Sequence, residues 1–133
     1  MIKAKELRLG NIVAEKSGFM MFVTAIFENS VYLDFEGNEG DIWEAEEKEL
    51  KPIPLTEEIL LKAGFYKHSE LVGWDWFSKG GVAIKMCPLK NGSFIPVYYN
   101  GDGYMFIEHV HQFQNLIFAL KRKELKLTIK DLK

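Results

Sequence analysis

The 133-residue sequence is poor in cysteine and contains no long apolar run, and each shortage excludes a class of protein. Cys87 is the only cysteine, so no intrachain disulfide can form and a reducing compartment is expected. No apolar run approaches the roughly 20 residues that cross a bilayer. The first residues, M-I-K-A-K-E-L-R, carry positive charge but lack the apolar segment of a secretion signal. We therefore expect a cytoplasmic protein without a membrane partner.

The charge is small overall but unevenly distributed along the chain. Residues 1–54 hold 11 acidic and 6 basic residues, a net charge of −5, whereas residues 55–133 hold 8 and 11, a net charge of +3. We interpret this asymmetry as a means of keeping each part soluble. The basic residues of the C-terminal tail are Lys121, Arg122, Lys123, Lys126, Lys130 and Lys133. They form the one basic stripe of the sequence, but the pI of 5.9 weighs against nucleic acid, which is therefore not expected as a partner.

The first part of the chain alternates short apolar stretches with turn residues. Gly10-Asn11 and Ser17-Gly18 are typical turn pairs, and the apolar residues of 31–35 alternate with polar ones as in a half-buried strand. Pro52 and Pro54 forbid helix and mark a boundary. Four or five strands this short predict a small, strongly bent sheet, and we expect an SH3-like β-barrel over residues 1–54.

The second part opens with a short helix and continues as a β-meander. Thr56 is a suitable N-cap and Gly64 a suitable stop for this helix. Period-two alternation then predicts about four antiparallel strands over residues 72–108. The chain after residue 123 is expected to form a short strand or to fray.

A C-terminal helix over Val110–Arg122 is the most regular element of the sequence. Its apolar residues recur at three- and four-residue steps and share one stripe: Phe113, Leu116, Ile117 and Leu120. Gln114, Asn115 and His111 occupy mostly the other side. We expect the stripe to pack on the meander. The prediction is thus an α+β fold in which residues 1–54 form a barrel-like part, residues 55–133 form the rest, and both pack as one compact unit.

Few residues suggest catalysis or metal binding. His109 and His111 lie two apart at a helix entry, but a metal site needs three or four ligands. We expect one imidazole to hydrogen-bond backbone and the other to face water. Cys87 lacks the base and positive setting of a catalytic thiol, so a small buried filler is expected. The sequence therefore predicts no enzyme, no metal and no cofactor.

An aromatic cluster is the most suggestive candidate for binding. Trp74 and Trp76 occupy one strand, and Tyr98 and Tyr99 end another. Exposed, these rings could stack on bases or hold a peptide, whereas buried they would be an ordinary core under the helices, which is the interpretation we favour. The candidate binding residues are Trp74, Trp76, Tyr98, Tyr99, His109 and His111.

Three segments resemble a family of small uncharacterised proteins encoded in bacterial prophages and other mobile elements. They are L-R-L-G-N-I-V from Leu7, P-L-T-E-E-I-L-L-K-A-G-F from Pro54, and V-H-Q-F-Q-N-L-I-F-A-L-K-R-K-E-L from Val110. Lys121-Arg122-Lys123 stands where the family would close the helix with a Thr-Gly pair. The resemblance implies a cytoplasmic accessory protein of a phage-like element, and it brings no assigned activity and no catalytic residues.

The leading hypothesis from the sequence is a non-catalytic binding protein that acts through contact with an unknown protein partner. The alternative is a nucleic-acid-associated protein that uses the barrel, the aromatic strand 74–77 or the basic tail. Enzymatic activity ranks third. The sequence does not decide between a monomer and a homodimer.

Overall fold

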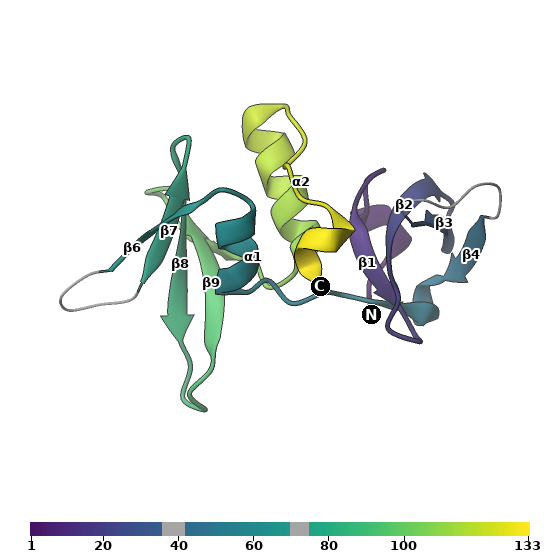
Figure 1. The fold of residues 1–133 in the computed structure, drawn as a ribbon, viewed down its shortest axis with the longest axis horizontal. Helices are drawn as coiled ribbons and strands as arrows, with labels where there is room; N and C mark the ends of the chain where they lie inside the picture. Colours follow the sequence, from purple (N-terminus) through teal and green to yellow (C-terminus); the bar gives the residue numbers. More distant parts are fainter. Residues whose placement is uncertain (36–41, 70–74) are drawn as a thin grey trace. The chain divides into compact units, whose positions relative to one another are not determined.

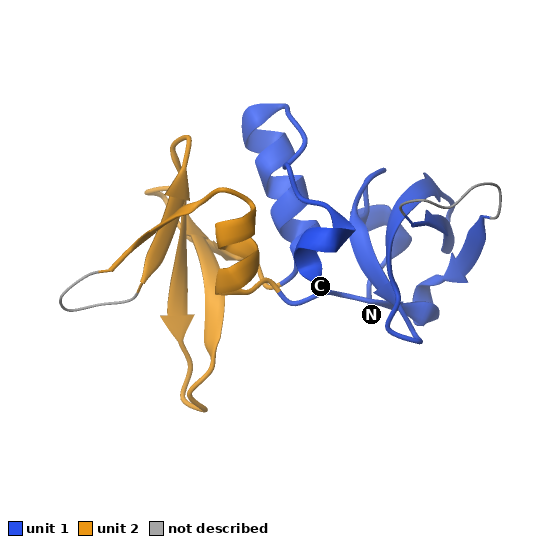
Figure 2. Ribbon diagram, in the orientation of Figure 1, with its two compact units in different colours: residues 1–54, 109–133 blue, residues 55–108 orange. Residues whose placement is uncertain are grey.

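The computed structural model describes residues 1–35, 42–69 and 75–133, and it is an α+β structure with two antiparallel sheets. Its chain divides into two compact units. Unit 1 contains residues 1–54 and 109–133, and unit 2 contains residues 55–108 (Figure 2). This division differs from the predicted one, because residues 109–133 were expected with the second part.

The sheet of unit 1 has the strand order β4-β3-β2-β1-β5 and curls into a half-barrel (Figure 1). Its strands are β1 (Ile12–Glu15), β2 (Met20–Ile26), β3 (Ser30–Asp34), β4 (Trp43–Glu46) and β5 (Leu50–Lys51). The register of β2 against β3 shifts between Val23 and Ala25, and such an irregularity increases the local bend of a sheet. Two 3-10 helices, η1 (Ala4–Glu6) and η2 (Glu47–Glu49), belong to the same unit.

The core of unit 1 consists of the inward residues of this curled sheet and the N-terminal segment. The alternation predicted for residues 31–35 is confirmed at Val31 and Leu33, which are buried beside half-buried Tyr32, but Phe35 lies beyond β3 and is exposed. The buried cluster contains Ile2, Ala4, Leu7, Val13, Met21, Val23, Val31, Leu33, Ala45 and Leu50.

Helix α2 (Val110–Lys121) belongs to unit 1 and lies against β1 of that unit, whereas the sequence analysis grouped this helix with the meander. Phe113 and Ile117 are buried as expected, but Leu120 is 43% exposed and is not part of the core. Gln114 is buried because its amide bonds the backbone of the Gly10–Ile12 segment: its Oε1 accepts from the Ile12 N–H at 2.8 Å, and its Nε2 donates to the Gly10 carbonyl at 3.2 Å. Gln114, on the polar side of α2, therefore faces the protein, because the backbone N–H and C=O groups of that segment need hydrogen-bond partners.

The C-terminal tail of unit 1 is neither a strand nor frayed. It ends in a third 3-10 helix, η3 (Ile129–Leu132), and Leu127 and Ile129 are buried. Arg122 ends α2 in the left-handed conformation with φ +55°, which glycine adopts more readily than other residues.

Unit 2 combines helix α1 (Glu57–Lys62) with a five-stranded meander of order β10-β9-β8-β7-β6 (Figure 1). The strands are β6 (Tyr66–His68), β7 (Trp76–Lys79), β8 (Val82–Pro88), β9 (Phe94–Tyr99) and β10 (Tyr104–Phe106). The predicted N-cap is confirmed, since the Thr56 hydroxyl accepts from the Ile59 N–H at 3.3 Å. Gly64 follows the helix with φ +90°, a conformation that suits glycine.

In each unit, hydrogen bonds join the two chain segments that lead into the other unit. In unit 1, Pro54 bridges His109 in antiparallel fashion, and the Val110 N–H donates to the Ile53 carbonyl at 2.8 Å. In unit 2, the Leu55 N–H donates to the Glu108 carbonyl at 2.9 Å. Unit 2 is therefore an insertion whose two ends are adjacent.

Candidate binding surface

The sheet of unit 2 has one face covered by α1. Lys67 of β6 forms a 2.6 Å ion pair with Glu57 of α1, and the Lys79 ammonium donates to the Ala63 carbonyl at 3.2 Å. Phe77 and Ile84 point to the same side and are fully buried. Because side chains alternate along a strand, the neighbouring residues point to the opposite side, which we call the outer face.

The strand register aligns a row of residues across the outer face. Pairing runs from His68 through Trp76, Lys85 and Val97 to Phe106, one residue from each strand. The aromatic residues of the row thus lie at its two ends, with the aliphatic stem of Lys85 between them. Tyr99 and Tyr104 pair with each other one step beyond Phe106 on the same face.

A hollow of about 460 Å³ occupies the β8–β10 end of the outer face. Its lining consists of Lys85, Cys87, Val97, Tyr99, Tyr104 and Phe106. The three aromatic residues are exposed, and Cys87 is half-exposed, not buried as predicted. This volume lies within the range of about 300–1,000 Å³ found for ligand pockets. Apolar ring faces beside one ammonium suit a side chain of a partner that is largely apolar.

The predicted aromatic cluster separates onto two faces. Trp76 lies on the outer face, where its ring stacks on His68 at 4.0 Å between centroids, and Tyr99 lies there too. Tyr98 points to the side covered by α1, opposite Ile84. Trp74 lies outside the described residues. The prediction that the cluster is mainly core is therefore wrong for Tyr99, and Trp76 is only half-buried.

Phe106, Tyr104 and Lys85 join the surface although the sequence analysis did not select Phe106 or Lys85. Phe106 follows a turn, Asn100–Gly103, in which the Asn100 side chain accepts from two backbone N–H groups. That turn fixes the pairing of Tyr99 with Tyr104, and counting two residues onward places Phe106 on the same face. The sequence could have predicted that Phe106 lies on this face, but only once the register of the hairpin was known.

The two histidines at the entry of α2 form a separate cluster in unit 1. His111 is only 2% exposed, its Nε2 lies 3.3 Å from Glu6 Oε1, and its Nδ1 has no hydrogen-bond partner among the described residues. His109 lies parallel to it, with 5.8 Å between ring centroids. Burial lowers the pKa of His111, and the Glu6 carboxylate offsets only part of this effect. The expectation that one imidazole bonds backbone and the other faces water is thus wrong for His111.

These histidines do not make a metal site within the described parts of the chain. Among residues 1–35, 42–69 and 75–133, no three histidine, cysteine, aspartate or glutamate side chains are grouped as metal ligands would be. His109 and His111 with Glu6 stabilise the start of α2, and the Gln112 side chain supports it by accepting from the His109 N–H at 3.0 Å.

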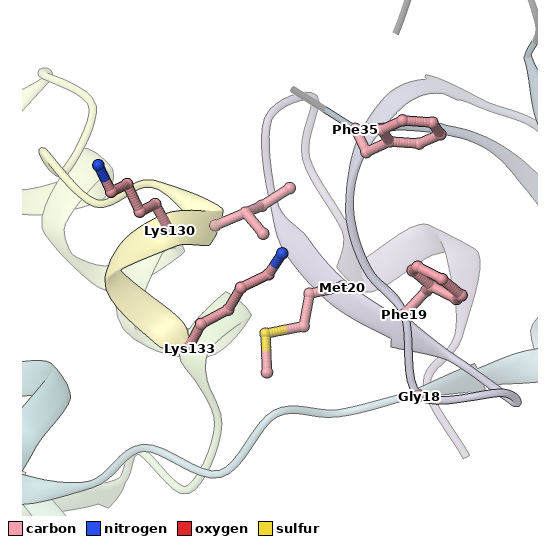
Figure 3. A pocket seen from close by; sticks show the side chains of 7 residues that line it. Gly18, Phe19, Met20, Phe35, Lys130 and Lys133 are labelled. Carbon is pink, nitrogen blue, oxygen red and sulfur yellow. The ribbon is translucent and has the colours of Figure 1, made fainter. Parts of the chain in front are cut away.

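A second hollow, of about 420 Å³, lies in unit 1 between the β1–β2 turn and η3 (Figure 3). Its lining consists of Gly18, Phe19, Met20, Phe35, Ile129, Lys130 and Lys133. Phe19 and Phe35 are exposed. Figure 3 shows the Lys133 side chain extending across the hollow beside Met20, whereas the Lys130 head points away from it. The hollow thus combines aromatic faces with one cation.

Comparison of the chain with protein-family models, with curated proteins and with solved structures gave no match. None of the helices in the described ranges has the length and apolar character needed to span a bilayer. The two hollows described above are therefore the candidate functional sites.

Proposed function

We propose that this protein is a non-catalytic binding protein that takes a partner protein on the outer face of unit 2. The observation that carries the proposal is the hollow lined by Tyr99, Tyr104 and Phe106, three exposed aromatic side chains on adjacent strands. Aromatic residues are enriched in protein interfaces and supply most hot spots, because they bury a large apolar area at little entropic cost.

The lining of the hollow favours binding over catalysis. A nucleophilic thiol needs a base within hydrogen-bond reach and a group that orients the base. Lys85 and Cys87 are the lining residues with titratable side chains besides the two tyrosines, and the Cys87 thiol donates to the Pro88 carbonyl at 3.9 Å. The rings and the Val97 side chain provide apolar contact area and contain no base that could activate the thiol.

Unit 1 would serve as the scaffold that carries this surface. The order β4-β3-β2-β1-β5, with the 3-10 helix η2 directly before β5, supports an SH3-like barrel for this unit. A cytoplasmic accessory protein of a phage-like element remains the setting that we propose, since its work would consist of holding another protein.

The second candidate function is binding of single-stranded nucleic acid at the hollow of unit 1. There the exposed rings of Phe19 and Phe35 line the same hollow as Lys133 of the basic tail, and the alternative hypothesis named both the barrel and this tail as possible binding elements. Bases stack on aromatic side chains while cations hold phosphates. A single inward cation predicts weak binding that salt abolishes.

A retention experiment with two matched variants tests both candidates. Tagged protein is incubated with lysate and with labelled single-stranded oligonucleotides at physiological salt. The variant Tyr99→Ala with Phe106→Ala should lose the retained protein partner, while Phe19→Ala with Phe35→Ala, which removes as many exposed rings from unit 1, should keep it. Equal retention by both variants and the wild type would refute the outer face. Oligonucleotide binding that only the Phe19 and Phe35 variant loses would establish the second candidate instead.

A further inference from the structure

The edge strands of the two sheets differ in how they are protected. An edge strand presents unpaired N–H and C=O groups, and proteins normally guard it with charge, with proline or by keeping it short. β4 carries Glu44 and Glu46, and β5 has two residues and is followed by Pro52. β6 carries Lys67 at its centre. Each of these three edges therefore has a feature that discourages pairing with another strand.

β10 is as short as β6, but it carries neither a charge nor a proline. The exposed fractions of its three residues are 68% for Tyr104, 55% for Met105 and 47% for Phe106. A second copy pairing here would meet no like charge within the strand. An antiparallel pair of β4 strands, by contrast, would bring four carboxylates together.

The backbone of β10 presents its free groups in a self-complementary pattern. The Ile107 N–H donates to the Pro96 carbonyl at 2.9 Å, and the Gly103 carbonyl accepts from the Asn100 N–H at 3.2 Å. Residues 103 and 107 therefore direct their backbone groups toward β9. Because the direction alternates, Met105 does the same, and Tyr104 and Phe106 direct theirs outward.

We propose that a second copy of this chain pairs with β10, antiparallel and centred on Met105. In this register Tyr104 of one copy stands opposite Phe106 of the other, twice by symmetry. Tyr104 and Phe106 both direct their backbone N–H and C=O groups outward. Each Tyr104–Phe106 pair can therefore form two backbone hydrogen bonds between the copies. The aromatic rings of each pair meet on the outer face, and the two Met105 side chains meet on the opposite face.

The contact area sets the expected strength of this dimer. Aromatic side chains bury about 150–250 Å² each when fully covered, so residues half exposed leave on the order of 100 Å² each. Tyr99, Tyr104, Met105 and Phe106 together offer about 400 Å² per copy by this reasoning. A specific interface usually buries about 800 Å² per partner, so the dimer should be weak and dependent on concentration.

A charge-exchange experiment at the symmetry axis tests the proposal. Sedimentation of the full chain from about 10 µM to about 1 mM should show the mean mass rising toward that of a dimer. Met105→Lys places two ammonium groups opposite each other and should raise the dissociation constant at least about tenfold, and Met105→Glu should do the same. An equimolar mixture of the two variants should associate again, because Lys then faces Glu. Restoration by mixing also excludes misfolding as the cause.

Phe94→Lys is the matched control. Phe94 is 59% exposed and shares the face of Met105, but it lies on the interior strand β9, so dimerisation should survive its replacement. A wild-type chain that stays monomeric at about 1 mM, or a dimer insensitive to Met105→Lys, would overturn the proposal. Because Met105 points away from the outer face, Met105→Lys should leave the protein partner of the proposed function bound. The two proposals can therefore fail separately.

Discussion

In the described part of the chain, unit 1 buries polar side chains that unit 2 lacks, and although both units expose apolar side chains, unit 2 gathers exposed rings on one face of its sheet. The buried polar or charged residues of the described ranges are Asn11, Glu15, His111 and Gln114, and all four belong to unit 1. Unit 2 instead exposes the rings of Tyr99, Tyr104 and Phe106 on one side of its sheet. Buried polar groups specify one arrangement because each needs its partner, while exposed rings add nothing to folding and cost solubility. Buried polar contacts therefore define the structure of unit 1, whereas the partner that we propose would bind the face of unit 2 on which these rings lie.

The two units also differ in the sequence separation of their contacts. Asn115 accepts from the Asn11 side chain at 2.8 Å and donates to the Glu6 carbonyl at 3.1 Å, which joins residues more than a hundred positions apart. Arg8 stacks over the Phe118 ring at 3.6 Å. In unit 2, by contrast, each strand pairs with the next one along the chain. Unit 1 therefore needs both ends of the chain, and unit 2 needs only hairpins and one helix.

The largest effect is expected from removing the buried ring of α2. Phe113 is fully buried, so Phe113→Ala should lower the free energy of unfolding of unit 1 by about 3–5 kcal/mol. Leu120→Ala is the control on the same helix, and it should cost under about 1 kcal/mol because Leu120 is largely exposed. Urea unfolding followed by hydrogen exchange in each unit measures both. Equal costs for the two changes would show that α2 is not held through Phe113.

A smaller effect is expected from breaking the hydrogen bonds between α2 and the Gly10–Ile12 segment. Gln114→Met keeps the side-chain volume but leaves the Ile12 N–H and the Gly10 carbonyl without their partner. We expect a loss of about 1–3 kcal/mol in the free energy of unfolding, since an unsatisfied buried group costs about this much. An unchanged urea midpoint would mean that water replaces the amide without cost.

The sequence predicted the elements better than their partners. The caps of α1 and the alternation of β3 and β8 depend on neighbours in the chain, and both could be predicted from spacing alone. The apolar stripe of α2 predicts only that the helix packs on a sheet, and it does not identify that sheet. The hydrogen bonds of Gln114 and Asn115 hold α2 to the sheet of unit 1, and their partners lie about a hundred residues away in the sequence. No local pattern carries that information.

The candidate site could be predicted in part for the same reason. Tyr99 was selected because aromatic residues cluster there in the sequence, but Phe106 required the hairpin register that brings β10 beside β9. Tyr98 lies on the other face of the sheet from this hollow, since adjacent residues of a strand point to opposite faces.

A pH-dependent difference between the units follows from His111. Its folded-state pKa lies below the ordinary value because burial disfavours the charged form, with Glu6 opposing and His109 adding to the depression. The unfolded chain therefore binds the proton more readily, and unit 1 should lose stability as the pH falls below about 6.5. Above that pH the contribution is fully present. Urea midpoints at pH 8 and pH 5 should differ more for the wild type than for His111→Gln, and identical differences would contradict the assignment.

The smallest effect is expected from removing unit 2 altogether. Pro54 bridges His109 and Val110 donates to Ile53, so an Asn-Gly turn placed between Pro54 and His109 can close the chain as a two-residue hairpin. None of the long-range bonds of Asn11, Gln114 or Asn115 leaves unit 1, and a shorter loop costs less entropy to close. The free energy of unfolding of the shortened chain should therefore match that of unit 1 in the full chain within about 1 kcal/mol. Hydrogen exchange of the α2 amides in both proteins measures this directly, and amides that exchange as in an unfolded chain after the excision would show that unit 1 depends on the inserted unit.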